Sequence, residues 1–341
     1  AIVALRILSP TSIRAIEDLL PILYPSVHSP SYGIIQQILI EAENNAAIFN
    51  KKSDLSQIHV GALDEMFSQG DPVLAGIDLE IGYLFLLSME DHRGGDDWEK
   101  TLVQGKNQGL ALEIVVKDAA RGISDGVNRV FSNAEQRDDC FHAHYEMGKR
   151  RLVLERRAYG AINQELEIQN KLKKAQQGGF DSLEKLEASL KIVSQRCICA
   201  IKTHDLFEQA MREAQEAMEF VDLQAGQIRT ALEMQTAIEV AAKKIKAIND
   251  KKCQKIGKYI SNRASGLALY MNDIAKQFNI LTERYGAEVV QIAAVIWRLV
   301  DDLKKGRRRW SRSQDKKHLI GAYHQFLQLA GKQADTIFAV V

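Results

Sequence analysis

The spacing of hydrophobic and polar positions changes twice along the chain. Residues 11–50 have apolar side chains at helical spacing, residues 56–141 mix short alternating runs with helical ones, and from Ala143 onward the spacing is helical almost throughout. Steps of two are typical of strands, whereas steps of three and four are typical of helices. The sequence therefore predicts an N-terminal helical segment, a central α/β region and a long helical region.

The central region predicts the element order β-β-β-α-β-α-β. The first three strands follow one another through short turns, which indicates a meander, and the later alternation of helices and strands favours parallel pairing. Because such crossovers are right-handed, we expect the fourth strand to lie beside the first and parallel to it. The expected strands are 57–64, 72–78, 82–88, 112–118 and 137–141, and the expected helices are 96–108 and 124–131.

The helical region begins with a run over 143–177 that ends at Gly178–Gly179, and Asp181 with Glu184 then forms a capping box for the next helix. Later helices are expected at 228–250, 252–281, 285–304 and 314–330. We therefore expect four parts. They are a helical, helix-turn-helix-like segment at 1–52, an α/β core at 56–164, an all-α insertion at 165–330 and the start of a return to the core at 331–341.

Composition supports this picture. All five prolines lie in the first 72 residues, and proline interrupts helices and central strands, so the rest of the chain should be rich in regular structure. With 46% hydrophobic and 26% charged residues, the chain is not of the disordered class. It has no long uncharged apolar run and no basic-then-apolar leader, so we expect a cytoplasmic protein without a membrane partner.

Two aspartates end the two strands that this topology places side by side. Asp64 closes the first expected strand and Asp118 closes the fourth. The carboxyl ends of neighbouring parallel strands form the ligand-binding edge of open α/β sheets. Converging carboxylates repel each other unless a cation neutralises them, and oxygen ligands suit Mg²⁺ or Mn²⁺. Either aspartate alone is more typical of a turn or a helix cap, but the pair favours a metal site.

Three segments resemble the catalytic segments of bacterial insertion-sequence transposases of the DDE class. The stretch 60–67 followed by 72–78 is similar to the first catalytic segment, and Val116–Gly122 is similar to the second. Asp139–His142, followed by 154–160, resembles the last strand and the helix after it. The motifs agree with those of the family, and so do their order and spacing along the chain. The resemblance covers most of residues 56–165.

The resemblance implies a ribonuclease-H-like fold in which Asp64 and Asp118 are the first two catalytic, metal-binding acids. It implies metal-dependent DNA cleavage and strand transfer, with transposon ends and target DNA as partners and a homodimer in the synaptic complex. It also implies that 1–52 is a remnant of a DNA-binding unit, and that 165–330 is a helical insertion before a catalytic glutamate on a late helix.

Two features depart from the family pattern. Asp118 is followed by Ala119-Ala120, where the family usually has two glycines. In addition, residues 286–341 lack the Arg-Ala-Ser-Ser pattern that precedes the family's glutamate.

These departures lead to an expectation about the extent of the chain. We expect the third acid to lie beyond Val341, with Glu283 and Glu288 as weaker candidates. Because the chain begins at Ala1 rather than at a methionine, we expect it to be the middle of a longer enzyme.

The net charge of +1 argues against a generally basic domain, but the cations are unevenly placed. One cluster begins at Lys149, and another, over 304–312, holds six cations around Trp310, which could stack on a base. His142 is a candidate accessory residue that contacts a phosphate or orients a carboxylate, with a structural histidine as the commoner alternative. The expected DNA-contacting residues are Lys149, Arg150, Arg151, Arg156, Arg157, Arg307, Arg308, Arg309, Trp310 and Arg312.

Two other classes of function stay open. The alanines after Asp118 and the missing third acid are also consistent with a catalytically inactive or domesticated, transposase-derived DNA-binding or scaffold protein. A helical-bundle interaction protein with an unrelated sheet domain is the other alternative, and it requires that the first and fourth strands are not neighbours.

Overall fold

A computed structural model describes the chain except for residues 10, 27, 179–182, 305–312, 332–333 and 335–341. The chain divides into two compact units, Ala1–Glu135 and Gln136–Val341. Among the described helices, none combines the length and the apolar character needed to cross a membrane.

The first unit begins with three helices, α1 (Ile2–Leu8), α2 (Ile13–Leu23) and α3 (Tyr32–Asn50). The sequence predicted the last two but not α1. Ser12 caps α2 by accepting a hydrogen bond from the backbone of Ala15 at 3.1 Å. Pro21 lies inside α2, two residues before its end.

A five-stranded mixed sheet follows, with the strand order β3-β2-β1-β4-β5. The meander is antiparallel, whereas β4 pairs with β1 in parallel, so the predicted adjacency of the first and fourth strands is confirmed. The strands are β1 (Val60–Ser68), β2 (Asp71–Asp78), β3 (Leu84–Met89), β4 (Ile114–Lys117) and β5 (Glu135–Asp138), and the connecting helices are α4 (Gly95–Asn107) and α5 (Arg121–Val130).

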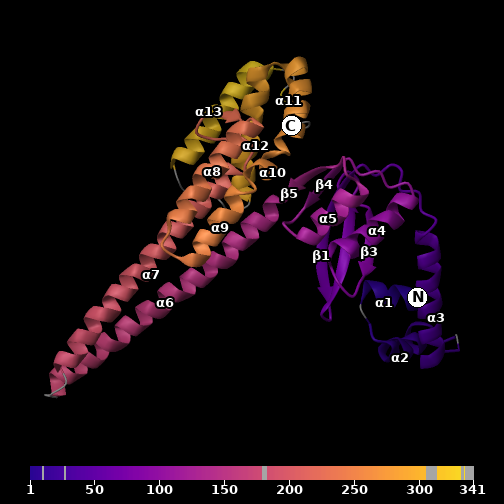
Figure 1. Cartoon of the computed structure of the whole chain (residues 1–341), viewed down its shortest axis with the longest axis horizontal. Helices are drawn as coiled ribbons and strands as arrows, with labels where there is room; N and C mark the ends of the chain where they lie inside the picture. The colour runs from indigo at the N-terminus through magenta and orange to yellow at the C-terminus, as the bar shows by residue number, and fades with distance from the viewer. Residues whose placement is uncertain (10, 27, 179–182, 305–312, 332–333, 335–341) are drawn as a thin grey trace. The chain divides into compact units, whose positions relative to one another are not determined.

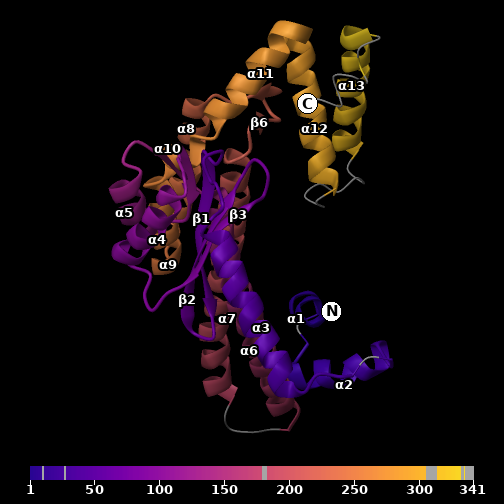
Figure 2. The ribbon, with the colours of Figure 1, turned by 90° about the vertical axis from the view of Figure 1, so that its right-hand side faces the viewer.

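Helices α4 and α5 pack side by side against the sheet (Figures 1 and 2). Their apolar side chains join those of the strands in one core, in which Leu63, Trp98 and Val127 are fully or almost fully buried. The helices approach closely because Gly126 has no side chain: a Cβ there would lie 2.4 Å from the Cβ of Trp98. This core fixes the position of β1 against the helices.

The second unit is mainly helical. Contrary to the predicted all-α character of 165–330, it includes a short antiparallel hairpin, β6 (Val221–Asp222) with β7 (Gln227–Ile228). The predicted boundary at 164/165 falls inside one continuous helix. The expected helix 252–281 is divided into three, and Asp181 lies outside the described residues. The helices are α6 (Cys140–Gly178), α7 (Leu183–Ala217), α8 (Ala231–Ala247), α9 (Lys251–Ser261), α10 (Ala264–Ala268), α11 (Met271–Tyr285), α12 (Ala287–Lys304) and α13 (Ser313–Ala330).

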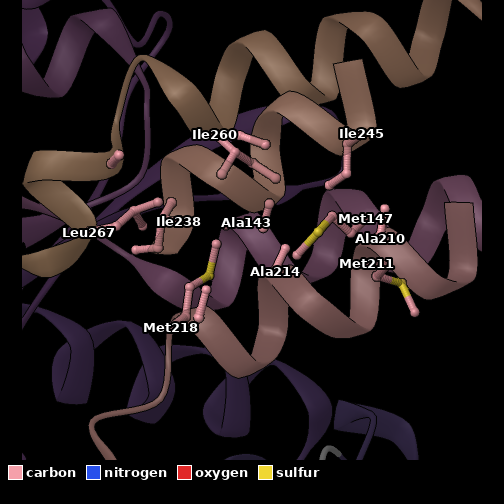
Figure 3. Close-up of a cluster of buried hydrophobic side chains, with 14 of the residues drawn as sticks. Ala143, Met147, Ala210, Met211, Ala214, Met218, Ile238, Ile245, Ile260 and Leu267 are labelled. Atoms are coloured by element: carbon pink, nitrogen blue, oxygen red, sulfur yellow. The ribbon is translucent and has the colours of Figure 1, made fainter. Parts of the chain in front are cut away.

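The largest core of this unit lies where α6, α7, α8 and α9 meet. Figure 3 shows Met147, Ala210 and Met218 among its buried side chains. Helices α8 and α9 come into backbone contact at Gly257, where a Cβ would lie 2.7 Å from the backbone nitrogen of Lys246. The small residues here therefore allow the helices to pack closely.

Candidate metal centre

The register between β1 and β4 places two aspartates next to each other. Val60 pairs with Ile114 and Leu63 pairs with Lys117, and the next residues along the two strands are Asp64 and Asp118. A carboxylate oxygen of Asp64 lies within 4.8 Å of one of Asp118. The structure therefore brings together the two acids that the sequence paired.

The position of Asp64 within its strand differs from the prediction. Asp64 does not close β1, which continues to Ser68 and stays paired with β2, where Ala75 is the partner of Asp64. Only the parallel pairing with β4 ends before Asp64. Asp64 thus lies on a strand that is paired with β2 at this position, and a paired strand is a more rigid support than a loop.

Each aspartate also has a local hydrogen bond. The backbone N–H of Glu65 donates to Oδ1 of Asp64 at 2.8 Å, and the N–H of Ala120 donates to Oδ1 of Asp118 at 2.7 Å. These bonds orient the carboxylates. Asp64 is exposed and Asp118 is half-buried, so the pair is accessible to solvent and to an ion.

Glu65, which follows Asp64, faces the other side of the sheet. Its side chain is 5% exposed and pairs with Arg93 at 2.7 Å. Its second oxygen accepts a hydrogen bond from Nε1 of Trp98 at 3.2 Å. Glu65 was not among the residues predicted for the site, although strand alternation places neighbouring residues on opposite faces of a sheet. Glu65 joins the strand that carries Asp64 to helix α4.

The loop after Asp118 accommodates its two alanines. Ala120 has φ −63° and ψ 125°, an ordinary conformation for any residue. Ala119 is also outside the left-handed region, in which Gln69 is the only residue other than glycine among those described. The departure from the glycine pattern therefore introduces no backbone strain here.

His142 lies in the first turn of α6, in the second unit. Its Nδ1 is 2.9 Å from Oδ2 of Asp139, whose other oxygen accepts a hydrogen bond from the backbone of Phe141. Along the chain, His142 follows β5 by four residues, and β5 is the neighbour of β4 in the sheet. Asp139 thus orients the imidazole at the start of the helix.

The basic cluster on α6 divides between two faces of the helix. Lys149 and Arg156 are exposed and seven residues apart, so they share a face, and Arg151 lies 3.6 Å from Glu155. By contrast, Arg150 and Arg157 both contact Asp250, at 2.6 and 3.2 Å.

Arg150 is the least accessible of the described residues that were expected to contact DNA. The side chain of Arg150 is 4% exposed and its charge is paired with Asp250. Arg157 is 54% exposed and keeps accessible surface despite the same partner. The sequence could not show this difference, because Asp250 is about a hundred residues away along the chain.

The remaining residues that the sequence predicted for the site add no contact or distance to its description. Arg307, Arg308, Arg309, Trp310 and Arg312 lie outside the described residues. Glu283 lies in α11 and Glu288 in the first turn of α12, both in the second unit. Neither glutamate gains an observation that favours it as a third acid.

No protein-family model matches the chain, and no curated protein is significantly similar to it. The chain is therefore characterised by its own architecture: a mixed α/β unit with two converging aspartates, followed by a mainly helical unit.

Proposed function

We propose that the protein is a DDE-type transposase, which cleaves DNA and transfers its strands with the help of a divalent metal. One observation carries the proposal: Asp64 and Asp118 converge at the ends of the paired stretch of two neighbouring parallel strands. A meander extended by a parallel strand also agrees with the ribonuclease-H-like fold that the resemblance implies. The adjacency of β1 and β4 argues against the alternative of an unrelated sheet domain.

The donor set fits a hard cation. Two carboxylates within 4.8 Å repel each other in the absence of a cation, and carboxylate oxygens are the ligands that Mg²⁺ and Mn²⁺ prefer. Asp64 and Asp118 would hold the ion, which when bound supplies an activated oxygen nucleophile and stabilises the leaving oxygen of a phosphodiester. The local hydrogen bonds to both aspartates keep their carboxylates oriented for this role.

The other parts of the proposal concern residues outside the acid pair. Lys149 and Arg156 would bind DNA phosphates from one exposed face of α6. His142 stays the proposed accessory residue, because it follows the strand next to β4 and Asp139 orients its ring. A third acid and a synaptic homodimer remain parts of this proposal that the resemblance suggests.

The experiment is a nicking assay on supercoiled plasmid DNA with Mg²⁺ or Mn²⁺. Wild-type protein should nick the plasmid, whereas Asp64→Asn and Asp118→Asn should each reduce the rate at least about a hundredfold. Asp71→Asn is the matched control, because Asp71 is an exposed acid of the same sheet and should not affect the rate. Nicking that persists in both variants of the acid pair would refute the proposal.

A catalytically inactive DNA-binding or scaffold protein is the second candidate, favoured by the alanines after Asp118 and by the lack of the family's Arg-Ala-Ser-Ser pattern in residues 286–341. It predicts DNA binding without any metal-dependent nicking by the wild-type protein. The same plasmid assay, combined with a binding measurement, therefore separates the two candidates.

A further inference from the structure

A further basic stretch lies among the described residues of the second unit, outside the clusters considered so far. Residues 243–258 contain seven lysines and a single acid, Asp250, in a protein whose net charge is only +1. This stretch joins the end of α8 to most of α9, and we refer to it as the lysine hairpin. All of its lysines are exposed: Lys243, Lys244, Lys246, Lys251, Lys252, Lys255 and Lys258.

The fold arranges these lysines in a defined way on α9. Lys251, Lys255 and Lys258 follow the i, i+4, i+7 spacing and therefore share one face of the helix. The opposite face carries Cys253 and Ile260, which are both fully buried in the core. The three lysines thus form a row of about 10 Å along the helix, pointing away from the core.

Close packing brings a second group of lysines next to this row. Because α8 and α9 make backbone contact at Gly257, the lysines at the end of α8 lie one helix diameter away. Lys244 is paired with Glu213 at 2.6 Å. Within the described part of the chain, the other six have no carboxylate within ion-pair distance. Their charges are therefore available to a partner.

A groove of about 400 Å³ borders the lysine hairpin. It lies between α6 and α9 and is lined by Lys149, Lys252 and Lys255, with Glu146 as its acid. The wall of the groove is held in place by Asp250, which caps α9 through the backbone of Cys253 at 3.0 Å and also binds Arg150 of α6. The buried arginine thus anchors the lysine hairpin against α6.

We propose that the lysine hairpin binds the phosphate backbone of duplex DNA. The inference goes beyond the proposed function, because it does not depend on the metal site. DNA presents one negative charge per about 1.7 Å of its axis, which matches rows of closely spaced cations. An anionic membrane is the less suitable partner, since stable membrane association also needs an apolar anchor. The lysine hairpin exposes no large hydrophobic side chain among its residues.

The test measures binding of the full chain to a fluorescent duplex of about 30 base pairs over a series of salt concentrations. The variant Lys251→Gln/Lys255→Gln/Lys258→Gln should bind about tenfold or more weakly, with a salt slope reduced by about 2–3. The matched control is Lys171→Gln/Lys173→Gln/Lys174→Gln, which removes the same charge from exposed positions of α6 in the same unit.

The control variant should stay close to wild type, and the row replaced by three arginines should retain binding, because the positive charge of the row carries the affinity. The proposal is overturned if the glutamine variant of the row binds DNA as tightly as the control variant. It is also overturned if the wild-type protein binds phosphatidylcholine vesicles with about 30% phosphatidylserine but not DNA. The duplex measurement reports on affinity and the plasmid assay on cleavage, so the two results are independent.

Discussion

Leu63 of β1 pairs with Lys117 of β4, and this pairing sets the next residue of each strand, an aspartate, at the same level of the sheet. We expect Mn²⁺ to raise the melting temperature of the wild-type protein, because an ion bound only by the folded state stabilises it. Neither Asp64→Asn nor Asp118→Asn should show this increase at the same Mn²⁺ concentration, whereas Asp71→Asn should. Differential scanning fluorimetry checks the prediction, and an equal increase in all four proteins would contradict it.

Asp250 should make the stability of the second unit depend on acid pH. Partial burial acts to raise its pKa, but the hydrogen bond from the backbone of Cys253 and the charge of Arg150 outweigh this effect and lower the pKa to about 2. Since the ordinary value is 3.8, the stabilisation is complete above about pH 4 and is lost as the pH falls towards 2.

The variant Asp250→Asn keeps a capping side chain but removes the charge that Arg150 needs. We expect it to lower the free energy of unfolding by about 1–3 kcal/mol at pH 7, because a buried arginine loses its partner. Urea unfolding at several pH values should show the difference from wild type shrinking between pH 4 and pH 2. A difference that is constant with pH would contradict the role of the ionised carboxylate.

Gly257→Ala should destabilise the protein. The new Cβ would lie 2.7 Å from the backbone nitrogen of Lys246 and 2.8 Å from the carbonyl oxygen of Ala242, so α8 and α9 would have to separate. We expect a cost of about 1–3 kcal/mol in thermal or urea unfolding. Gly148→Ala is the control, because a Cβ at this helical position has no neighbour within 4 Å and should stabilise the protein by about 0.5–1 kcal/mol.

Arg298 should be essential to the packing of α12 against α7. Its side chain is 2% exposed and lies 2.9 Å from Glu216 and 3.1 Å from Asp302, which is itself buried. Replacing Arg298 by methionine keeps an apolar stem in the same place but removes the positive charge. We expect a loss of about 3–5 kcal/mol in unfolding experiments, because the buried carboxylate of Asp302 loses its counter-charge. The double variant Arg298→Met/Asp302→Leu should recover part of the loss.

The four cysteines should differ in reactivity. Cys199 is exposed, whereas Cys197 and Cys253 are buried. Burial, and then the charge of Asp139, raises the pKa of Cys140 to about 12, so this thiol is protonated at neutral pH. A disulfide reagent applied to the native protein at pH 8 should therefore modify one thiol rapidly, and Cys199→Ser should abolish that phase. Rapid modification of a second thiol would contradict the burial pattern.

Local patterns and one topological rule were sufficient to predict the central elements and the adjacency of Asp64 and Asp118. The handedness of crossovers determines which strand lies beside β1, and it does not depend on side-chain detail. By contrast, the pairing of Arg150 with Asp250 depends on the tertiary packing of α6 against α9. A short stretch of sequence does not show which residues from distant parts of the chain come into contact. The buried Arg150 was therefore predicted to contact DNA.

Element ends were less predictable for the same reason. Asp64 was placed at the end of its strand because the alternating pattern of residues 57–64 ends there, yet pairing with β2 extends β1 to Ser68. The lysine hairpin is visible in the sequence as seven lysines in sixteen residues, but only the close packing of α8 and α9 at Gly257 brings the two groups of lysines together.

The hydrogen bond between Trp98 and Glu65 has a consequence for how this protein tolerates change. Neighbouring positions of a strand face opposite sides, so a slip of β1 by one residue would exchange Asp64 and Glu65. The indole would lose its acceptor and the acid pair would be broken in the same event. Substitutions in the core beneath the sheet that displace β1 would therefore also displace Asp64, so the core and the acid pair cannot vary independently.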